Sequence, residues 1–300
     1  MSWVQDKQNL NEFHAVHRSM TSQVTHIAGY QFKAVPDVDT LRGQILTLCA
    51  QTHIRGSVLI SPEGINLGLA GTHTDIDFIQ EQLNSTCGFG QLVLNTTYTR
   101  SAPYRRLLVK TREELVPAKA LLEAPGTDLS DFARPAYITS ERLKQWLDTE
   151  QEMVLLDLRN SFECELGTFD DAIHLGLRHF RQLESARGRL EELPKDKPVV
   201  TFCTGGIRCE KGAPYVARQG FEQVYKLKGG ILDYLGKFND YGWHGDCFVF
   251  DERVALDSRL EPTYSRLCSS CQCMLNTDEA QFCAACSRPG ADGMHPNGTG

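Results

Sequence analysis

The residue best placed to do chemistry is Cys203, which opens the stretch 203–209 and is followed there by a second cysteine, Cys209. The apolar run 198–202 before it is typical of a buried parallel strand, and residues 210–218 after it favour a helix. Between a strand and a helix N-terminus, backbone N–H groups and the helix dipole stabilise an anion. The sequence therefore predicts a nucleophilic thiolate at Cys203 rather than a structural cysteine beside a tight turn.

The spacing within the loop narrows the chemistry. Arg208 stands five positions after Cys203, so the loop is one residue shorter than the Cys-x5-Arg loop of cysteine phosphatases. The shorter loop resembles the active-site loop of rhodaneses, which cradles a persulfide sulfur. Cys203 is then the expected nucleophile and sulfur carrier, stabilised by loop N–H groups. The other active-site loop residues are Thr204, Gly205, Gly206, Ile207 and Cys209.

Two of these residues keep alternative roles. Arg208 either adds positive charge beside the sulfur, as a catalytic residue, or pairs with a neighbouring acid. Cys209 either resolves a Cys203 persulfide as a disulfide or faces the buried side of the helix. The sequence alone does not choose between them.

The upstream segment agrees with the rhodanese resemblance. A buried strand, 154–157, ends on the first residue of a pattern similar to the rhodanese one. That pattern, Asp-x-Arg-x3-Glu-x3-Gly-x-Phe-x2-Ala, runs from Asp157 to Ala172. Its charged members are Asp157, Arg159 and Glu163, and we expect them mainly to brace the sheet and the loop. Residues 224–231 resemble the last rhodanese strand and its Gly-Gly turn. We expect an α/β rhodanese domain with a mainly parallel sheet over 136–240.

The N-terminal part carries a different pattern. Strand-like and helix-like segments alternate in the order βαββαβ, which is typical of a ferredoxin-like α+β domain, also described as acylphosphatase-like. We expect this domain over 23–116. The remaining divisions are a lead-in at 1–22, a linker at 117–135, a C-terminal extension with a Cys-rich segment at 241–290, and a disordered tail at 291–300.

Length, charge and cysteine content limit the classes of protein to which the chain can belong. The chain has 300 residues, enough for two or three domains, and a net charge of −7 that argues against a generally basic nucleic-acid binder. No apolar run approaches the roughly 20 residues of a membrane span, and the start lacks the pattern of a signal peptide. We therefore expect a cytoplasmic protein with no membrane partner. Eleven cysteines in such a chain indicate catalysis or metal binding rather than disulfides.

Four C-terminal cysteines form two C-x2-C pairs. Four thiolates at this spacing suit a tetrahedral structural zinc, whose binding would supply the folding energy that so small a segment lacks. The alternative is a redox-active or incidental cysteine tail. The predicted ligands are Cys268, Cys271, Cys283 and Cys286.

Two basic stretches are candidates for binding RNA, because arginines interleaved with aromatic rings contact phosphates and stack on bases. Either stretch could instead be a solvated face. The first stretch contains Arg100, Tyr104, Arg105 and Arg106, followed by Lys110 and Arg112. The second contains Arg178, His179, Phe180 and Arg181, with Arg187 and Arg189.

Three segments together are more specific than any one motif. Residues 60–71, 203–211 and 243–254 resemble signature segments of the bacterial tRNA uridine(34) hydroxylases, rhodanese-related proteins formerly described as sulfurtransferases. The resemblance covers about 20–286. It implies oxygen-dependent hydroxylation at C5 of the wobble uridine, giving 5-hydroxyuridine, with Cys203 as the essential cysteine and a persulfide as its intermediate.

The resemblance also implies partners and co-substrates. They are the anticodon loop of tRNA, molecular oxygen, and a sulfur or electron donor. Activation of O2 normally needs a metal, a flavin or another reactive cofactor. The sequence shows neither a dinucleotide fingerprint nor a two-His-one-carboxylate set, so we expect no nucleotide cofactor, and the residues do not explain how O2 is activated.

Two other functions stay open. A sulfurtransferase would move sulfane sulfur through a Cys203 persulfide, and the Cys203 loop alone does not separate it from a hydroxylase. The additional N-terminal domain favours a macromolecular substrate. A non-enzymatic binding module is the third possibility, and the intact cysteine, glycines and arginine of the loop argue against it.

Overall fold

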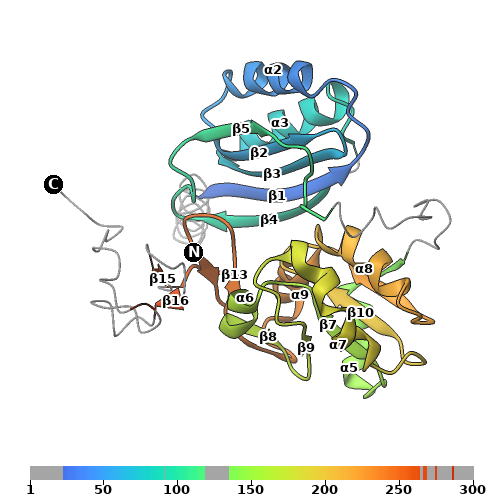
Figure 1. Ribbon diagram of the computed structural model, residues 1–300. Helices are drawn as coiled ribbons and strands as arrows, with labels where there is room; N and C mark the ends of the chain where they lie inside the picture. The colour runs from blue at the N-terminus through green and yellow to red at the C-terminus, as the bar shows by residue number, and fades with distance from the viewer. Residues whose placement is uncertain are drawn as a thin grey trace, which may run out of the picture. The chain divides into compact units, whose positions relative to one another are not determined.

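The computed structural model describes residues 23–90, 92–118, 135–263, 266–268, 274–275 and 286 (Figure 1). The expected lead-in, most of the expected linker, the tail, Cys271 and Cys283 lie outside these residues. The chain divides into two compact units, Met1–Leu115 and Val116–Gly300, which we call the N-terminal and C-terminal units. Within the described residues, no helix has the length and apolar character needed to cross a membrane.

The N-terminal unit has the expected βαββαβ order, with a fifth strand added. Its sheet runs in the order β4-β1-β3-β2-β5, with β5 parallel to β2 and the other neighbours antiparallel. Both helices cover one face of the sheet (Figure 1). The elements are β1 Val24–Phe32, α2 Val38–Cys49, β2 Arg55–Ser61, β3 Gly64–Gly71, α3 His73–Ser85, β4 Val93–Thr99 and β5 Leu107–Thr111.

Local sequence accounts for the two helices. The side chain of Asp37 accepts a hydrogen bond from the Thr40 amide at 2.9 Å, and that of Thr72 accepts one from the Asp75 amide at 3.1 Å. Asp37 and Thr72 are therefore the N-cap residues of α2 and α3. Apolar residues at helical spacing then face the alternating apolar residues of β1, β2 and β3. The fully buried members of this core include Ile27, Ile60, Ile65, Leu69, Ile76 and Ile79.

The C-terminal unit contains the expected α/β domain with a parallel sheet. The sheet order is β6-β11-β10-β7-β9, and every pair in it is parallel. The carboxyl ends of all its strands therefore meet at one edge. The elements are β6 Ala136–Ile138, α5 Ser140–Asp148, β7 Val154–Asp157, α6 Ser161–Leu166, β9 Ile173–His174, η1 Phe180–Ala186, α7 Arg187–Glu191, β10 Val199–Phe202, α8 Cys209–Ala217, β11 Val224–Leu227 and α9 Gly230–Phe238.

The chain after α9 packs onto the same core. Strand β12, Trp243–Gly245, pairs antiparallel with β8, Gly167–Phe169, and a short hairpin follows, made of β13, Cys247–Phe248, and β14, Ala255–Leu256. The Phe169 ring joins these parts, because the rings of Phe202, Tyr234 and Trp243 meet it edge to face at 5.0, 4.8 and 5.2 Å. A last pair, β15 Arg266–Leu267 and β16 Met274–Leu275, lies further along the chain.

We predict that Phe169→Ala lowers the free energy of unfolding of the C-terminal unit by about 3–5 kcal/mol, because it empties a fully buried site where three rings converge. Urea unfolding followed by tryptophan fluorescence tests this, since Trp146 and Trp243 both belong to that unit. Phe169→Leu, which keeps part of the volume, should cost less. A loss below about 1 kcal/mol for the alanine variant would contradict the role of Phe169.

Candidate active site

Cys203 follows β10 directly and lies beneath the loop that leads into α8. Its side chain has no exposed surface. The Gly206 N–H donates a hydrogen bond to Sγ at 3.2 Å, and the N–H groups of Arg208 and Cys209 also donate to it. The Cys209 thiol donates a further hydrogen bond to the same sulfur. The turn thus surrounds Sγ with donors, which is the arrangement that stabilises an anion.

The surroundings of the loop shift the pKa values of its two cysteines in opposite directions. Burial alone would raise the pKa of Cys203, but the Cys209 hydrogen bond, the Arg208 charge and the backbone donors outweigh it and lower that pKa to about 6. Burial, and then donation to Cys203, raise the pKa of Cys209 well above its usual value. The opposite shifts of the two pKa values favour a thiolate at Cys203 beside a protonated Cys209.

Arg208 is paired with an acid, which is one of the two roles that the sequence left open for it. Its Nη1 and Nη2 donate to the two oxygens of Glu163 at 2.6 and 2.7 Å, and Glu163 is fully buried. Glu163 is fixed in turn by the Asn160 N–H at 3.1 Å, at the start of α6. This fork holds Arg208 still while its charge continues to lower the pKa of Cys203.

A second buried pair lies beneath the first. Arg159 donates to both oxygens of Asp157, with its Nη2 at 2.6 Å and its Nε at 2.9 and 3.0 Å. Its remaining donors reach the carbonyls of Glu163 and Gly167 at 3.2 and 2.6 Å. Arg159 thereby ties the end of β7 to the middle and the C-terminal end of α6, the helix that carries Glu163.

The N-terminus of α9 supports the loop from the other side. The N–H groups of Ile231 and Leu232 donate to the carbonyls of Cys203 and Thr204 at 3.0 and 3.1 Å. Gly230 makes this approach possible. Its φ is +66°, and a Cβ there would lie 2.5 Å from the Cys203 carbonyl oxygen. The Gly-Gly pair read from the sequence as a turn is thus part of the active-site support.

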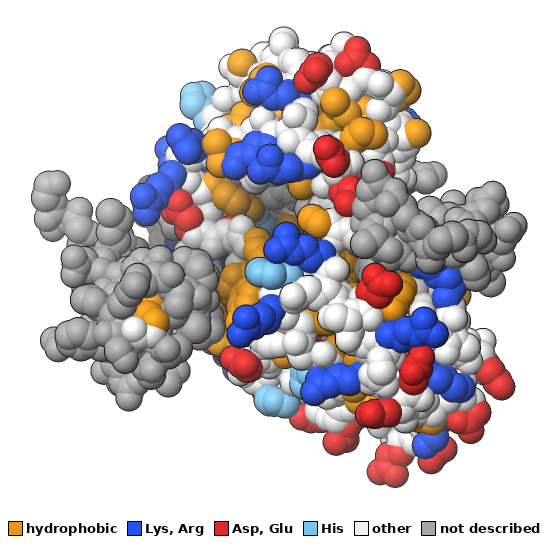
Figure 2. All heavy atoms as spheres, in the orientation of Figure 1, with side chains coloured by type: hydrophobic (Ala, Val, Ile, Leu, Met, Phe, Trp, Pro, Cys, Tyr) orange, Lys and Arg blue, Asp and Glu red, His pale blue; other side chains and the backbone are white. Residues whose placement is uncertain are grey.

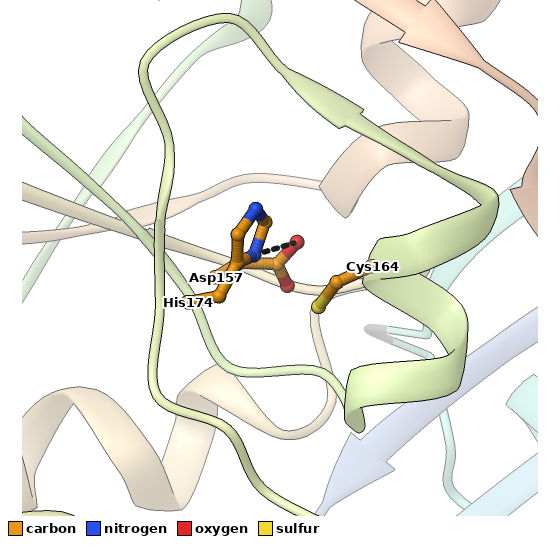
Figure 3. A group of neighbouring side chains, drawn as sticks. All are labelled: Asp157, Cys164 and His174. Atoms are coloured by element: carbon orange, nitrogen blue, oxygen red, sulfur yellow. Dashed lines mark ion pairs between the residues drawn. The ribbon is translucent and has the colours of Figure 1, made fainter.

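Asp157 also meets two side chains with metal-ligand chemistry, Cys164 and His174. One ligand atom of each lies within 4.8 Å of the others, and the two side chains approach Asp157 from opposite sides (Figure 3). The oxygens of Asp157 already accept from Arg159 and Thr168, and burial raises the pKa of the Cys164 thiol. A cation could bind here only after Asp157 released those donors, so the residues fit a metal poorly.

The hairpin of β13 and β14 reaches the loop, which sequence reasoning missed. The Thr204 hydroxyl lies 3.4 Å from the Phe248 carbonyl oxygen, and the Phe248 ring packs against Phe162 of α6 at 5.0 Å. The Arg208 guanidinium carbon lies 5.7 Å from the centre of the Phe250 ring. Nothing in the periodicity of 246–254 predicts this contact, because it depends on the pairing of β12 with β8.

Comparisons with known proteins agree with both units. Residues 24–115 match the family described as UPF0176 acylphosphatase like domain, and residues 139–237 match the rhodanese-like domain family. A tRNA uridine(34) hydroxylase from Cupriavidus necator is 36% identical over 264 residues, covering 86% of this chain and 92% of that protein. This chain belongs to the tRNA uridine(34) hydroxylase family. Proteins of the same name from Ralstonia nicotianae and Burkholderia vietnamiensis are 38% and 34% identical, covering 86% and 89% of this chain and 92% and 99% of theirs.

The first basic stretch of this family member lies in the loop between β4 and β5, on β5 and just after it. Arg100, Arg105, Arg106 and Lys110 are exposed, as is Arg112. In Figure 2 several Lys and Arg side chains lie over the part of the N-terminal unit that Figure 1 labels β5. Tyr104 is half-buried, and its hydroxyl is bonded to His26 Nε2 at 3.0 Å. Arg55 on β2, which the sequence did not single out, is exposed too, and the Gly56 amide next to it bonds to the Arg106 carbonyl.

The second basic stretch forms a pocket of about 400 Å³ in the C-terminal unit. Arg178 and Arg189 line it, together with Gln182 and Ser185. The segment follows β9, which is separated from β10 only by β7. Because all strands of this sheet are parallel, the segment that forms the pocket leaves β9 at the same edge of the sheet as the Cys203 loop leaves β10.

Two of the four predicted zinc ligands are described. The sulfurs of Cys268 and Cys286 lie 3.7 Å apart, although eighteen positions separate the residues. Tetrahedral zinc with Zn–S bonds of about 2.3 Å holds its sulfurs about 3.8 Å apart, so this pair fits the expected metal.

We predict that the Cys203 thiolate forms with a midpoint near pH 6, measured as ultraviolet thiolate absorbance against Cys203→Ser. Because this pKa is lower in the folded chain than in the unfolded one, the stabilisation is present above the unfolded pKa and is lost as pH falls through about 6. Cys209→Ala removes one donor to the thiolate and should raise the midpoint by about one to two pH units.

Cys49→Ala is the matched control, because burial raises the pKa of that thiol to about 11 and it should not contribute near pH 6. A midpoint near the ordinary cysteine value in the wild-type protein, or no change in Cys209→Ala, would contradict the assigned roles of the two thiols.

Proposed function

We propose that this protein uses O2 to hydroxylate C5 of uridine 34 in tRNA, and that Cys203 is its nucleophile. The buried cradle that stabilises a Cys203 thiolate carries the proposal. Relatives named tRNA uridine(34) hydroxylase, which align with both units, support the choice of substrate. The substrate, tRNA, and the need for reduced thiols fit a cytoplasmic location.

Cys203 would act by adding to the uracil ring. C6 of uracil is the electrophilic end of a double bond conjugated to the C4 carbonyl, so the thiolate forms an S–C6 bond and leaves C5 electron-rich. C5 then bonds to O2 and, after protonation, carries a hydroperoxide. Loss of the C5 hydrogen and of the Cys203 sulfur at the end restores the ring and frees the enzyme.

The second oxygen atom needs two electrons and two protons to leave as water. The Cys209 thiol can reduce the hydroperoxide, leaving the C5 hydroxyl and becoming a sulfenic acid. After Cys203 is released from C6, its thiol condenses with that sulfenic acid, giving water and a Cys203–Cys209 disulfide. The sum is uridine plus O2 plus two thiols, giving 5-hydroxyuridine, water and a disulfide. A thiol or other two-electron donor then restores the pair.

Glu163, Arg208 and the Asp157–Arg159 pair would position this chemistry without reacting. Arg208 sits close enough to Sγ to stabilise its charge, and Glu163 keeps that guanidinium from turning away. Asp157 and Arg159 hold the helix on which Glu163 lies. We assign no redox step to Cys164 or His174.

Two basic surfaces are the proposed contacts for the RNA backbone. One is the β4–β5 cluster, in the loop between these strands and along β5, and the other is the pocket of Arg178 and Arg189, in the segment that follows β9. Both present guanidinium groups suited to phosphates on a chain whose net charge is −7.

We also propose that Cys268, Cys271, Cys283 and Cys286 hold a structural zinc ion. The sulfur spacing of Cys268 and Cys286 supports the metal. With four thiolate ligands the ion would have no open position, so it would stabilise the C-terminal segment and take no part in hydroxylation.

We predict that the protein transfers heavy oxygen from labelled O2 into 5-hydroxyuridine in tRNA lacking a modification at uridine 34. Cys203→Ser should abolish the product, because serine is not ionised at neutral pH. Without an added reductant, the wild-type protein should make about one hydroxylated uridine per chain and accumulate the Cys203–Cys209 disulfide. Cys209→Ser cannot form that disulfide, and it should make less than one hydroxylated uridine per chain. Accurate-mass analysis of the digested nucleosides and of the tryptic peptides measures both.

A thiolated nucleoside, or no tRNA product together with sulfur transfer from thiosulfate, would reject hydroxylation and leave the sulfurtransferase. Hydroxylation that survives in Cys203→Ser would reject Cys203 as the nucleophile.

We predict that replacing Arg100, Arg106 and Lys110 together by alanine weakens tRNA binding and lowers the salt slope of log K by about two, as expected for three lost contacts to single-stranded phosphates. Filter binding across a range of salt concentrations measures the slope. The control replaces Lys144, Lys197 and Lys237, three lysines that are ion-paired with acidic neighbours. It changes the net charge equally and should leave the slope unaltered. Equal salt slopes for the two variants would exclude the β4–β5 cluster as a contact for tRNA phosphates.

A further inference from the structure

Phe250 presents an unusual surface for an apolar residue. Among the described residues it is the most exposed large hydrophobic side chain, at 69%, and the other such residues are all tyrosines, at 42–55%. Two of those tyrosines donate a hydrogen bond from the hydroxyl, Tyr137 to Glu210 and Tyr241 to Asp148. Phe250 has no polar atom for water to bond. A single exposed ring is common on proteins, so its position must decide whether it has a function.

The hairpin fixes Phe250 in this outward position. On either side of the tip, the Val249 amide donates to the Val254 carbonyl at 2.9 Å. Within the tip, Arg253 and Asp251 form a buried ion pair at 2.6 Å. Phe248 and Val249, just before Phe250, are buried in the same short stretch. Exposure of the ring is therefore a consequence of an ordered turn, whose neighbours are all anchored.

The ring lies beside the active-site loop that holds the proposed nucleophile. Its edge-to-face contact with Phe248 measures 4.9 Å between ring centres, and the Phe248 carbonyl oxygen lies 3.4 Å from the Thr204 hydroxyl of the active-site loop. The Arg208 guanidinium carbon is 5.7 Å from the centre of the Phe250 ring, and the same guanidinium lowers the pKa of Cys203. An exposed aromatic ring and an anchored arginine thus border the site where Cys203 is held.

An isolated aromatic ring beside a cation suits a planar, polar-edged ligand better than an apolar one. A lipid tail or an amphipathic helix needs a continuous apolar surface, whereas a nucleobase needs only a π face on which to stack. Enzymes that react with a base also draw it out of the stack and hold it against aromatic side chains. The occupant that fits Phe250 is therefore a nucleobase of the RNA, which under the proposed function is the target uracil.

We infer that Phe250 is the stacking residue for the uracil that Cys203 attacks, holding the base at the rim of the active-site loop. The inference rests on the proposed function and deepens it by assigning a substrate-positioning residue. Because Cys203 has no exposed surface in this structure, the base must first be captured outside the loop. The Phe250 ring offers that first contact, next to Arg208.

Kinetics of tRNA hydroxylation by four variants test the inference. Phe250→Tyr and Phe250→Trp keep a π face, and KM should stay within about threefold of the wild-type value. Phe250→Leu keeps apolar bulk without a π face, and Phe250→Ala keeps neither. In both of these, KM should rise by about tenfold or more, since loss of one base–aromatic stack weakens binding by that order. Tyr241→Leu removes another exposed ring of the same unit and should leave KM unchanged.

A second readout separates this inference from the proposed function. In Phe250→Trp carrying Cys203→Ser, an oligonucleotide with the anticodon-loop sequence should quench the added tryptophan fluorescence, and a stem without the loop should not. Absence of hydroxylation in the wild-type protein would reject the proposed function and leave this binding test valid. Hydroxylation with the same KM in Phe250→Leu and Phe250→Tyr, or no quenching, would overturn the stacking role alone.

Discussion

The active site depends on holding a negative charge on a sulfur that has no contact with solvent. Burial by itself would protonate Cys203. The thiolate persists only because the turn after β10 brings several N–H donors and the Cys209 thiol to one atom, while Arg208 contributes positive charge. Displacing that turn would therefore raise the pKa of Cys203 and favour its protonated form.

The buried ion pairs follow from that constraint. An unpaired Arg208 at this depth would be costly and would be free to turn toward solvent, so the fork from Glu163 both neutralises it and fixes its direction. Glu163 then needs a fixed helix, and Arg159 supplies it by joining Asp157 to the carbonyls of Glu163, within α6, and of Gly167, just after it. Buried pairs of this kind add little net stability, and their more useful contribution here is geometric.

The sequence predicted those features that local pattern determines. The alternation of strands and helices placed Cys203 at a strand end, and the Cys-x4-Arg spacing identified the loop. The sequence left two roles open for Arg208, because its partner, Glu163, lies 45 positions away along the chain and contacts Arg208 only in the folded protein. Phe250 and Arg55 were missed for the same reason. Each owes its position to strand pairing, of β12 with β8 and of β2 with β5, and no periodicity in the neighbouring residues reports it.

The protonated state of Cys209 connects the geometry to the choice of reaction. While Cys209 keeps its proton it stabilises the Cys203 thiolate, and the same thiol stores the electrons that reduction of a peroxide requires. Closing the disulfide would remove the nucleophile and its donor together, so each turnover would switch the site off until a reductant acts. Transfer of sulfane sulfur from one thiol to another draws no electrons from Cys209, whereas release of that sulfur as sulfide would oxidise the same pair to a disulfide. A second thiol held beside the nucleophile is therefore required by the proposed hydroxylation and dispensable for thiol-to-thiol sulfur transfer.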